Sequence, residues 1–148
     1  MRTTREQELP PQKQGASTLL RLTDSGLRLA DQGADIRGKK VYDSAREEIG
    51  KVHDLLIDEA ERKVRFLEVA SGGFLGLGDT KVLIPVEAVT GITEDEVRIN
   101  QTRSRIAGAP RYNPDLIEEP FLNDVYAYYG AWTPFWGPGY VYPRYPYF

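Results

Sequence analysis

The hydrophobic pattern between Leu27 and Asn100 predicts β-strands rather than helices. Apolar residues in this region come in short runs, are often β-branched, and alternate with polar residues. Residues 48–58 illustrate the pattern, since strand periodicity places Ile49 and Ile57 on one face. We find no comparable helical stripe in this part of the chain.

Polar turns divide the same region into about six short segments. Pro85 lies near the end of one of them and indicates a strand end, an edge or a bulge, because proline cannot donate a ladder hydrogen bond. Many short strands joined by turns are typical of a small barrel or sandwich, and we expect a mainly β protein with a small antiparallel β-barrel. The expected strands are residues 38–43, 48–58, 63–69, 81–86, 89–92 and 96–100.

After Asn100 the pattern changes to a turn-rich connector and then to a helical stretch over residues 118–129. Pro120 fits the first turn of this helix, and Gly130 is expected to end it. We divide the chain into a disordered arm (1–18), a barrel domain (19–116), a C-terminal helix (117–130) and an aromatic segment (131–148).

The aromatic segment, rich in proline and glycine, is the part that a six-stranded barrel explains least. The last 23 residues hold 11 of the 16 aromatic side chains of the protein. One interpretation is that the segment folds back over apolar barrel surface. The other is that it forms a surface for self-association or partner binding, since Tyr and Trp are favoured interface anchors. Shallow contact with a membrane is less favoured, because Arg144 is the only charge there. The candidate interface residues are Trp132, Phe135, Trp136, Tyr140 and Tyr142.

Composition narrows the possible partners. The net charge of −3, from 19 basic and 22 acidic residues, offers no broad positive field for a phosphate backbone, so we expect no direct nucleic-acid binding. The absence of cysteine excludes disulfides and thiolate chemistry. The N-terminal 18 residues lack the apolar core of a secretory signal, and no apolar run is long enough to span a bilayer. We expect a soluble, cytoplasmic protein.

The glycine-rich stretch from Gly72 to Lys81 resembles a phosphate-binding loop only superficially. Gly73 and Gly78 have the spacing of a nucleotide-binding loop, but Asp79 stands where that loop requires lysine. A carboxylate there repels phosphate. We therefore interpret the stretch as a connection between two strands and expect no nucleotide or other cofactor.

The remaining candidates for chemistry are weak. His53 is the only histidine, and its neighbours Asp54 and Asp58 on the same expected strand cannot converge with it on a metal. We expect His53 to face solvent. The stretch 24–26 matches three residues of an aspartic protease motif, but a turn explains it better. No catalytic constellation emerges, and we expect that the protein is not an enzyme.

Several motifs occur together in the order and spacing of the PRC-barrel domain, which the chain resembles from about Leu19 to Gly130. The runs that carry the resemblance are 35–38, 41–43, 49–52, 54–58, 64–69, 72–78 and 82–86, followed by an exit segment with Ala109, Pro110, Tyr112, Pro114 and Asp115.

The resemblance implies a small β-barrel and a bias toward binding. Barrels of this family occur in the H subunit of photosynthetic reaction centres and in a small-subunit ribosome-maturation factor, where they dock on larger assemblies. Our first hypothesis is a non-enzymatic module that docks on a partner protein or on itself. The alternative is an accessory factor in ribosome or RNA maturation that acts through a ribosomal protein.

Overall fold

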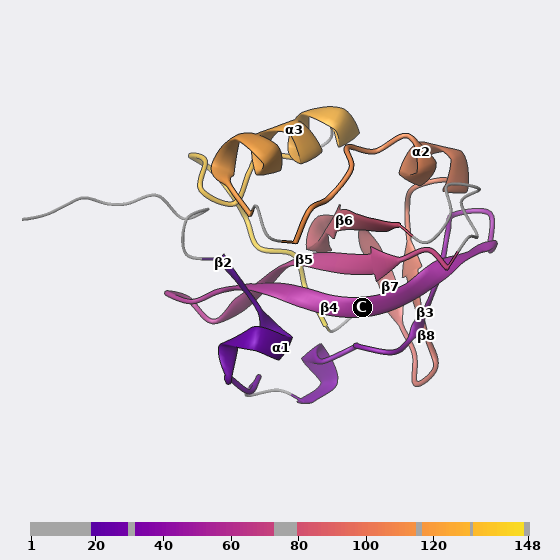
Figure 1. Ribbon diagram of the computed structural model, residues 1–148, viewed down its shortest axis with the longest axis horizontal. Helices are drawn as coiled ribbons and strands as arrows, with labels where there is room; N and C mark the ends of the chain where they lie inside the picture. Colours follow the sequence, from indigo (N-terminus) through magenta and orange to yellow (C-terminus); the bar gives the residue numbers. More distant parts are fainter. Residues whose placement is uncertain (1–18, 30–31, 73–79, 115–116, 131, 147–148) are drawn as a thin grey trace, which may run out of the picture.

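A strongly twisted β-sheet forms the centre of the molecule, with helices packed around it (Figure 1). The computed structural model describes residues 19–29, 32–72, 80–114, 117–130 and 132–146. Both the expected disordered arm and the central glycines of the loop at 73–79 lie outside these residues. The elements are β2 (Leu19–Arg21), α1 (Leu22–Ser25), the 3-10 turn η2 (Gln32–Ala34), β3 (Lys40–Tyr42), β4 (Glu48–Asp58), β5 (Lys63–Ala70), β6 (Lys81–Pro85), the 3-10 turn η3 (Val86–Ala88), β7 (Val89–Ile92), β8 (Glu96–Ile99), α2 (Arg103–Ala107) and α3 (Glu119–Tyr129).

Strand β4 organises the seven-stranded sheet, whose order is β6-β5-β4-β3-β8-β7 with β2 also paired to β4. One edge of β4 pairs along its length with β5, and the other edge pairs first with β3 and then with β2, all antiparallel. The prediction of a mainly β fold with about six strands is confirmed. Two details differ from the prediction. Strands β3 and β8 pair in parallel, and the sheet contains one additional strand, β2, which is too short to show any alternation in the sequence.

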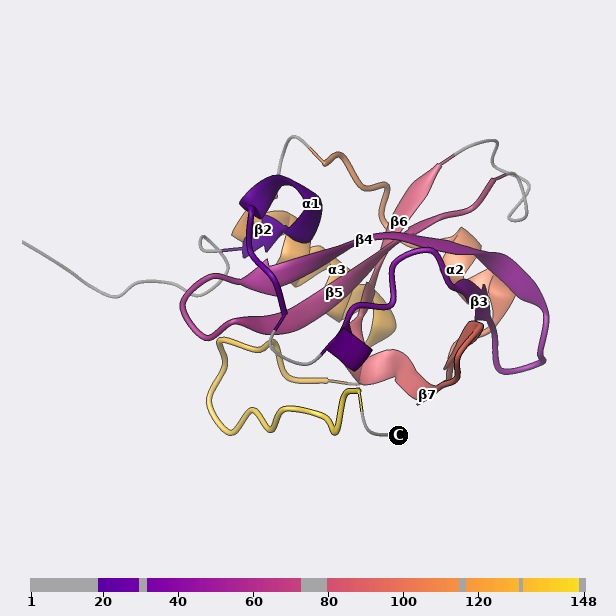
Figure 2. The same cartoon turned by 90° about the horizontal axis from the view of Figure 1, so that it is seen from below.

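The start of β4 lies unusually close to the end of β5. Gly50 has φ 153°, and a Cβ added there would come within 2.2 Å of the carbonyl oxygen of Ala70. Only glycine allows two strands to approach this closely without displacing one of them. Figure 2 shows the long β4–β5 hairpin from below.

Two irregularities interrupt the β4–β5 pairing. The register shifts between Val52 and Asp54, and again opposite the pair Leu56 and Ile57, where Arg65 is the extra residue. A β-bulge of this kind re-aims the side chain of the inserted residue. Simple alternation would place Arg65 with Leu67 on the side opposite Phe66, but the extra residue breaks this pattern, and all three side chains are buried.

Helix α3 covers the sheet in Figure 1 and ends as predicted. Its buried residues include Leu122 and Val125, and the ring of Tyr126 packs edge-on against Phe66 with centroids 5.4 Å apart. Gly130 takes the left-handed conformation with φ 71° and donates its N–H to the carbonyl of Tyr126, which closes the helix. The chain then turns back toward the barrel.

A buried carboxylate fixes the β3–β4 turn to the helix that sequence reasoning missed, α2. Asp43 Oδ1 accepts the backbone N–H groups of Ala45 and Glu47 at 2.9 and 2.7 Å, and its Oδ2 accepts that of Arg103 at 2.7 Å. The acidic side chain thus satisfies three donors that two separate segments would otherwise leave unpaired.

Candidate binding surface on the aromatic segment

The described part of the aromatic segment, residues 132–146, runs along the barrel without helix or strand (Figure 2). Phe135 is buried, and Trp136 packs edge-on against both Phe135 and Tyr126, with centroid distances of 4.9 and 5.8 Å. Trp132 lies beside Tyr129 at 6.3 Å. The frequent Pro and Gly residues explain the irregular path, because they prevent regular secondary structure.

The guanidinium of Arg65 lies at the centre of this contact. It stands 4.5 Å from the ring centroid of Phe135, 5.8 Å from that of Tyr140 and 5.5 Å from that of Tyr142. Arginine binds the faces of aromatic rings through their negative quadrupole, and more strongly when water is excluded. Arg65 therefore joins three aromatic side chains of the segment to β5.

Two carboxylates also contact the guanidinium of Arg65. Its Nη2 lies 3.1 Å from Asp58 Oδ2 and 2.9 Å from Glu61 Oε1. Arg65 and Asp58 are almost completely buried, whereas Glu61 is exposed. The buried charge of Arg65 is thus balanced by Asp58, and the faces of the aromatic rings add a further favourable electrostatic contact.

Tyrosine hydroxyls attach the segment to the barrel at three further points. Tyr140 donates a hydrogen bond to the carboxylate of Glu87, Tyr142 donates to the carbonyl of Val64 at 3.0 Å, and Tyr145 donates to a carbonyl at residue 34. Burial raises the pKa of Tyr142 to about 12 and raises the pKa of Tyr140 further. Burial also raises the pKa of Glu87 above its ordinary value. The hydroxyls of Tyr140 and Tyr142 therefore remain protonated donors at neutral pH.

The five predicted interface residues are brought together, and all of them contact the barrel or helix α3. Phe135 is buried, while Trp132, Trp136, Tyr140 and Tyr142 are partly buried and pack against the core. The fold-back interpretation thus describes one side of the segment, and the interface prediction remains a prediction about its other side.

Sequence reasoning missed Arg65, Glu87 and Tyr145, and no local pattern could have paired them with the segment. Next to the partly buried rings, Val141 is 81% exposed.

A second polar cluster lies around the fully buried Glu68. Arg21 donates to both carboxylate oxygens of Glu68 at 3.0 Å, and His53 Nδ1 lies 2.6 Å from Oε2. Asp54, also buried, stands 3.5 Å from the same guanidinium and accepts the N–H of Thr23. The hydrogen bond to Glu68 and the two nearby carboxylates raise the pKa of Arg21 above its already high ordinary value, so its charge is permanent. This network ties β2 to the β4–β5 hairpin.

The position of His53 agrees with the expectation that this side chain reaches solvent, because about half of it is exposed. Within the described ranges, the structure contains no group of three or more His, Asp or Glu residues that could hold a metal ion. Among the same residues, no helix is both long and apolar enough to cross a lipid bilayer.

The sequence of the barrel matches a known family model. The model of the PRC-barrel domain matches residues 30–106, more than half of the chain. The chain belongs to the PRC-barrel family. PRC-barrel domains are generally non-catalytic. A search of curated proteins found no match to the chain.

The match to the PRC-barrel domain spans η2 to most of α2 and leaves out several elements that complete this structure. Strand β2, helix α3 and the aromatic segment all lie outside the matched residues. The side chains that hold the aromatic segment, Arg65 and Glu87, are nevertheless part of the matched barrel. The candidate binding surface is therefore assembled from barrel and non-barrel residues together.

Proposed function

We propose that this PRC-barrel protein is a non-enzymatic binding module that docks on a partner protein or on a second copy of itself. The contact surface is the outer side of the aromatic segment. The observation that carries the proposal is the fixed position of the aromatic rings of the segment. The guanidinium of Arg65 contacts the rings of Phe135 and Tyr142, and the exposed Val141 precedes Tyr142 in the chain. The family adds support, because its domains are generally non-catalytic.

Rigid presentation of aromatic residues favours binding. Tyr and Trp are enriched at the centres of protein interfaces, where they supply large contact areas with few rotatable bonds. Here the hydroxyls of Tyr140 and Tyr142 are already engaged with the barrel, so the rings lose little further freedom when a partner binds. The segment thus combines a high aromatic content with a low entropic cost of association.

The test is a charge placed on the exposed side of the segment, where it leaves the packing beneath unchanged. Val141→Glu puts a carboxylate at a position that is 81% exposed, so the variant should fold normally. We expect it to reduce recovery of a partner by affinity capture, or to reduce the mass measured by light scattering if the protein self-associates. Deletion of residues 131–148 should have the same effect on association but also uncovers Arg65.

Thr90→Glu is the matched control, because it adds the same charge at an exposed position on β7. If Val141→Glu and Thr90→Glu behave like the wild type in both assays, the aromatic segment is not the contact surface. Co-sedimentation of wild-type protein with ribosomal subunits would identify the partner as a ribosomal component. If no partner and no self-association is found with any variant, the binding function itself is wrong.

A further inference from the structure

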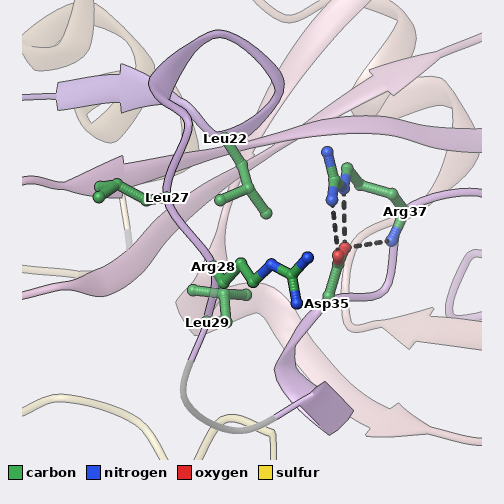
Figure 3. A pocket seen from close by; sticks show the side chains of 6 residues that line it. All are labelled: Leu22, Leu27, Arg28, Leu29, Asp35 and Arg37. Atoms are coloured by element: carbon green, nitrogen blue, oxygen red, sulfur yellow. Dashed lines mark hydrogen bonds and ion pairs between the residues drawn. The ribbon is translucent and has the colours of Figure 1, made fainter.

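A second surface, separate from the aromatic segment, has the composition of an anion-binding pocket. It is a cavity of about 350 Å³ beside α1, lined by Leu22, Leu27, Arg28, Leu29, Asp35 and Arg37. Figure 3 shows its six side chains, which come from α1 and from the two connecting stretches that follow it. Most of this lining, from Leu22 to Leu29, precedes the residues that the family model matches.

Arg37 is fixed in place on one side of the pocket. Its Nε and Nη2 donate to the two oxygens of Asp35 at 2.8 and 2.7 Å, and its Nη1 donates to the hydroxyl of Thr23 at 3.1 Å. A guanidinium has five N–H donors, so about two of them remain available for a ligand. The paired Arg37 lowers the pKa of Asp35, which is therefore ionised at neutral pH. Asp35 thus fixes the orientation of the Arg37 guanidinium, and part of the hydrogen-bonding capacity of Arg37 remains available to a ligand.

Arg28 supplies the charge that is not balanced. Its side chain is exposed and makes no hydrogen bond or ion pair with any residue that the structure describes. Figure 3 shows its guanidinium extended toward the Asp35–Arg37 pair. The lining therefore carries two positive charges and one negative charge, a net charge of +1. A single negative charge on the ligand would balance it.

The three leucines of the lining favour a ligand that has an apolar part as well as a negative charge. Leu22 is buried, and Leu27 and Leu29 are half-buried, so they give the pocket an apolar wall beside the two arginines. We propose that this pocket binds the carboxylate side chain of a glutamate in an acidic segment of a partner protein. The methylene groups of the glutamate would lie on the leucines, and its carboxylate would pair with Arg28 and the remaining donors of Arg37.

Charge and size together favour this ligand over other anions. Phosphate carries about 1.5 to 2 negative charges at neutral pH, which exceed the net charge of the lining, and Asp35 would repel the excess. Arginine forks match a carboxylate in a two-point geometry. The cavity volume has room for a glutamate side chain together with part of the peptide that carries it. The inference rests on the proposed binding function, to which it adds the chemistry of the partner.

The test is a titration of the isotope-labelled full chain followed by NMR. The probe is a capped tripeptide of leucine, glutamate and leucine, and the comparison probes are the same tripeptide with glutamine in the centre and inorganic phosphate. We expect the glutamate peptide to shift the signals of the Arg28 side chain and of the Leu27 and Leu29 methyl groups saturably. The glutamine peptide should bind about tenfold more weakly, because it cannot form a charge-assisted pair.

Variants locate the site. Arg28→Gln should weaken binding of the glutamate peptide by about tenfold or more, whereas Arg144→Gln, which removes an exposed arginine from the aromatic segment, should leave it unchanged. Leu29→Ser should weaken both peptides alike, since it removes apolar contact only.

The proposal is overturned if no probe gives saturable shifts, if the two peptides bind equally, or if phosphate binds as tightly as the glutamate peptide. Failure of this proposal is distinguishable from failure of the proposed function. If Arg28→Gln leaves partner capture intact while Val141→Glu abolishes it, the module binds through the aromatic segment alone. If neither variant alters capture or self-association, the proposed function fails as well.

Discussion

Replacement of Arg65 by methionine tests whether the aromatic segment is held by this guanidinium. Methionine fills a similar volume and adapts to the site, so packing losses should be small. The variant removes the charge that neutralises the buried Asp58, 3.1 Å away, and the cation that faces three aromatic rings. Removal of one partner of a buried ion pair costs about 3–5 kcal/mol. The exposed contact with Glu61 adds little, because water screens it.

We therefore expect Arg65→Met to lower the free energy of unfolding by about 3–5 kcal/mol. Arg65→Lys keeps a charge near Asp58 but loses the planar stacking surface, so its loss should be about 1–2 kcal/mol. Glu61→Gln is the control, with an expected change below about 1 kcal/mol. The expected loss is largest for Arg65→Met because Asp58 is buried, and it is smallest for Glu61→Gln because Glu61 is exposed.

The assay is urea unfolding followed by two signals. Both tryptophans of the protein lie in the aromatic segment, so tryptophan emission reports the segment, whereas far-UV circular dichroism reports the barrel. In Arg65→Met we expect emission to shift to longer wavelength at lower urea than the dichroism changes. An unfolding free energy within about 1 kcal/mol of the wild type, together with unchanged emission, would show that Arg65 does not hold the segment.

Two further substitutions test other features of the structure. Gly50→Ala forces a methyl group against the carbonyl oxygen of Ala70 and should cost at least about 2 kcal/mol in urea unfolding, whereas Gly91→Ala, which meets open space, should be close to neutral. Glu87→Gln keeps an acceptor for Tyr140 and removes a titratable group. Because burial raises the pKa of Glu87 above 4.5, its contribution to stability is full below that pH and is lost as the pH rises through the folded-state pKa. Wild type should therefore gain stability relative to Glu87→Gln as the pH is lowered toward 4.5 in urea titrations; a constant difference would contradict this assignment.

Local patterns were enough to predict the strands and helix α3. The alternation over β4, the turn residues around it and the helix stop at Gly130 are all properties of neighbouring residues, which a single sequence displays. Strand β2 and helix α2 were missed because they are too short to show a period. The Asp43 carboxylate that joins the start of α2 to a distant turn is also a long-range contact that no local pattern encodes.

The candidate site was predictable only in part. The aromatic content of the segment indicated contact with some surface, but the surface itself is set by residues about 70 positions earlier, such as Arg65 and its neighbours. The bulge at Arg65 has no signature in the sequence, and simple alternation separates this side chain from Phe66. Likewise, the convergence of Arg28 and Arg37 on one pocket depends on the path of the connecting chain.

The hydrogen bond from Tyr145 to the carbonyl at residue 34 spans 111 positions of sequence, and it has a consequence for the order of folding. Contacts at such separations form late, because a long loop must close first. During synthesis the strands are made well before the aromatic segment, so for a time Arg65 and the surface around it have no cover. At this stage the nascent chain exposes apolar barrel surface that the aromatic segment later covers. A chaperone or protease that recognises such surface could therefore distinguish the nascent chain from the finished protein.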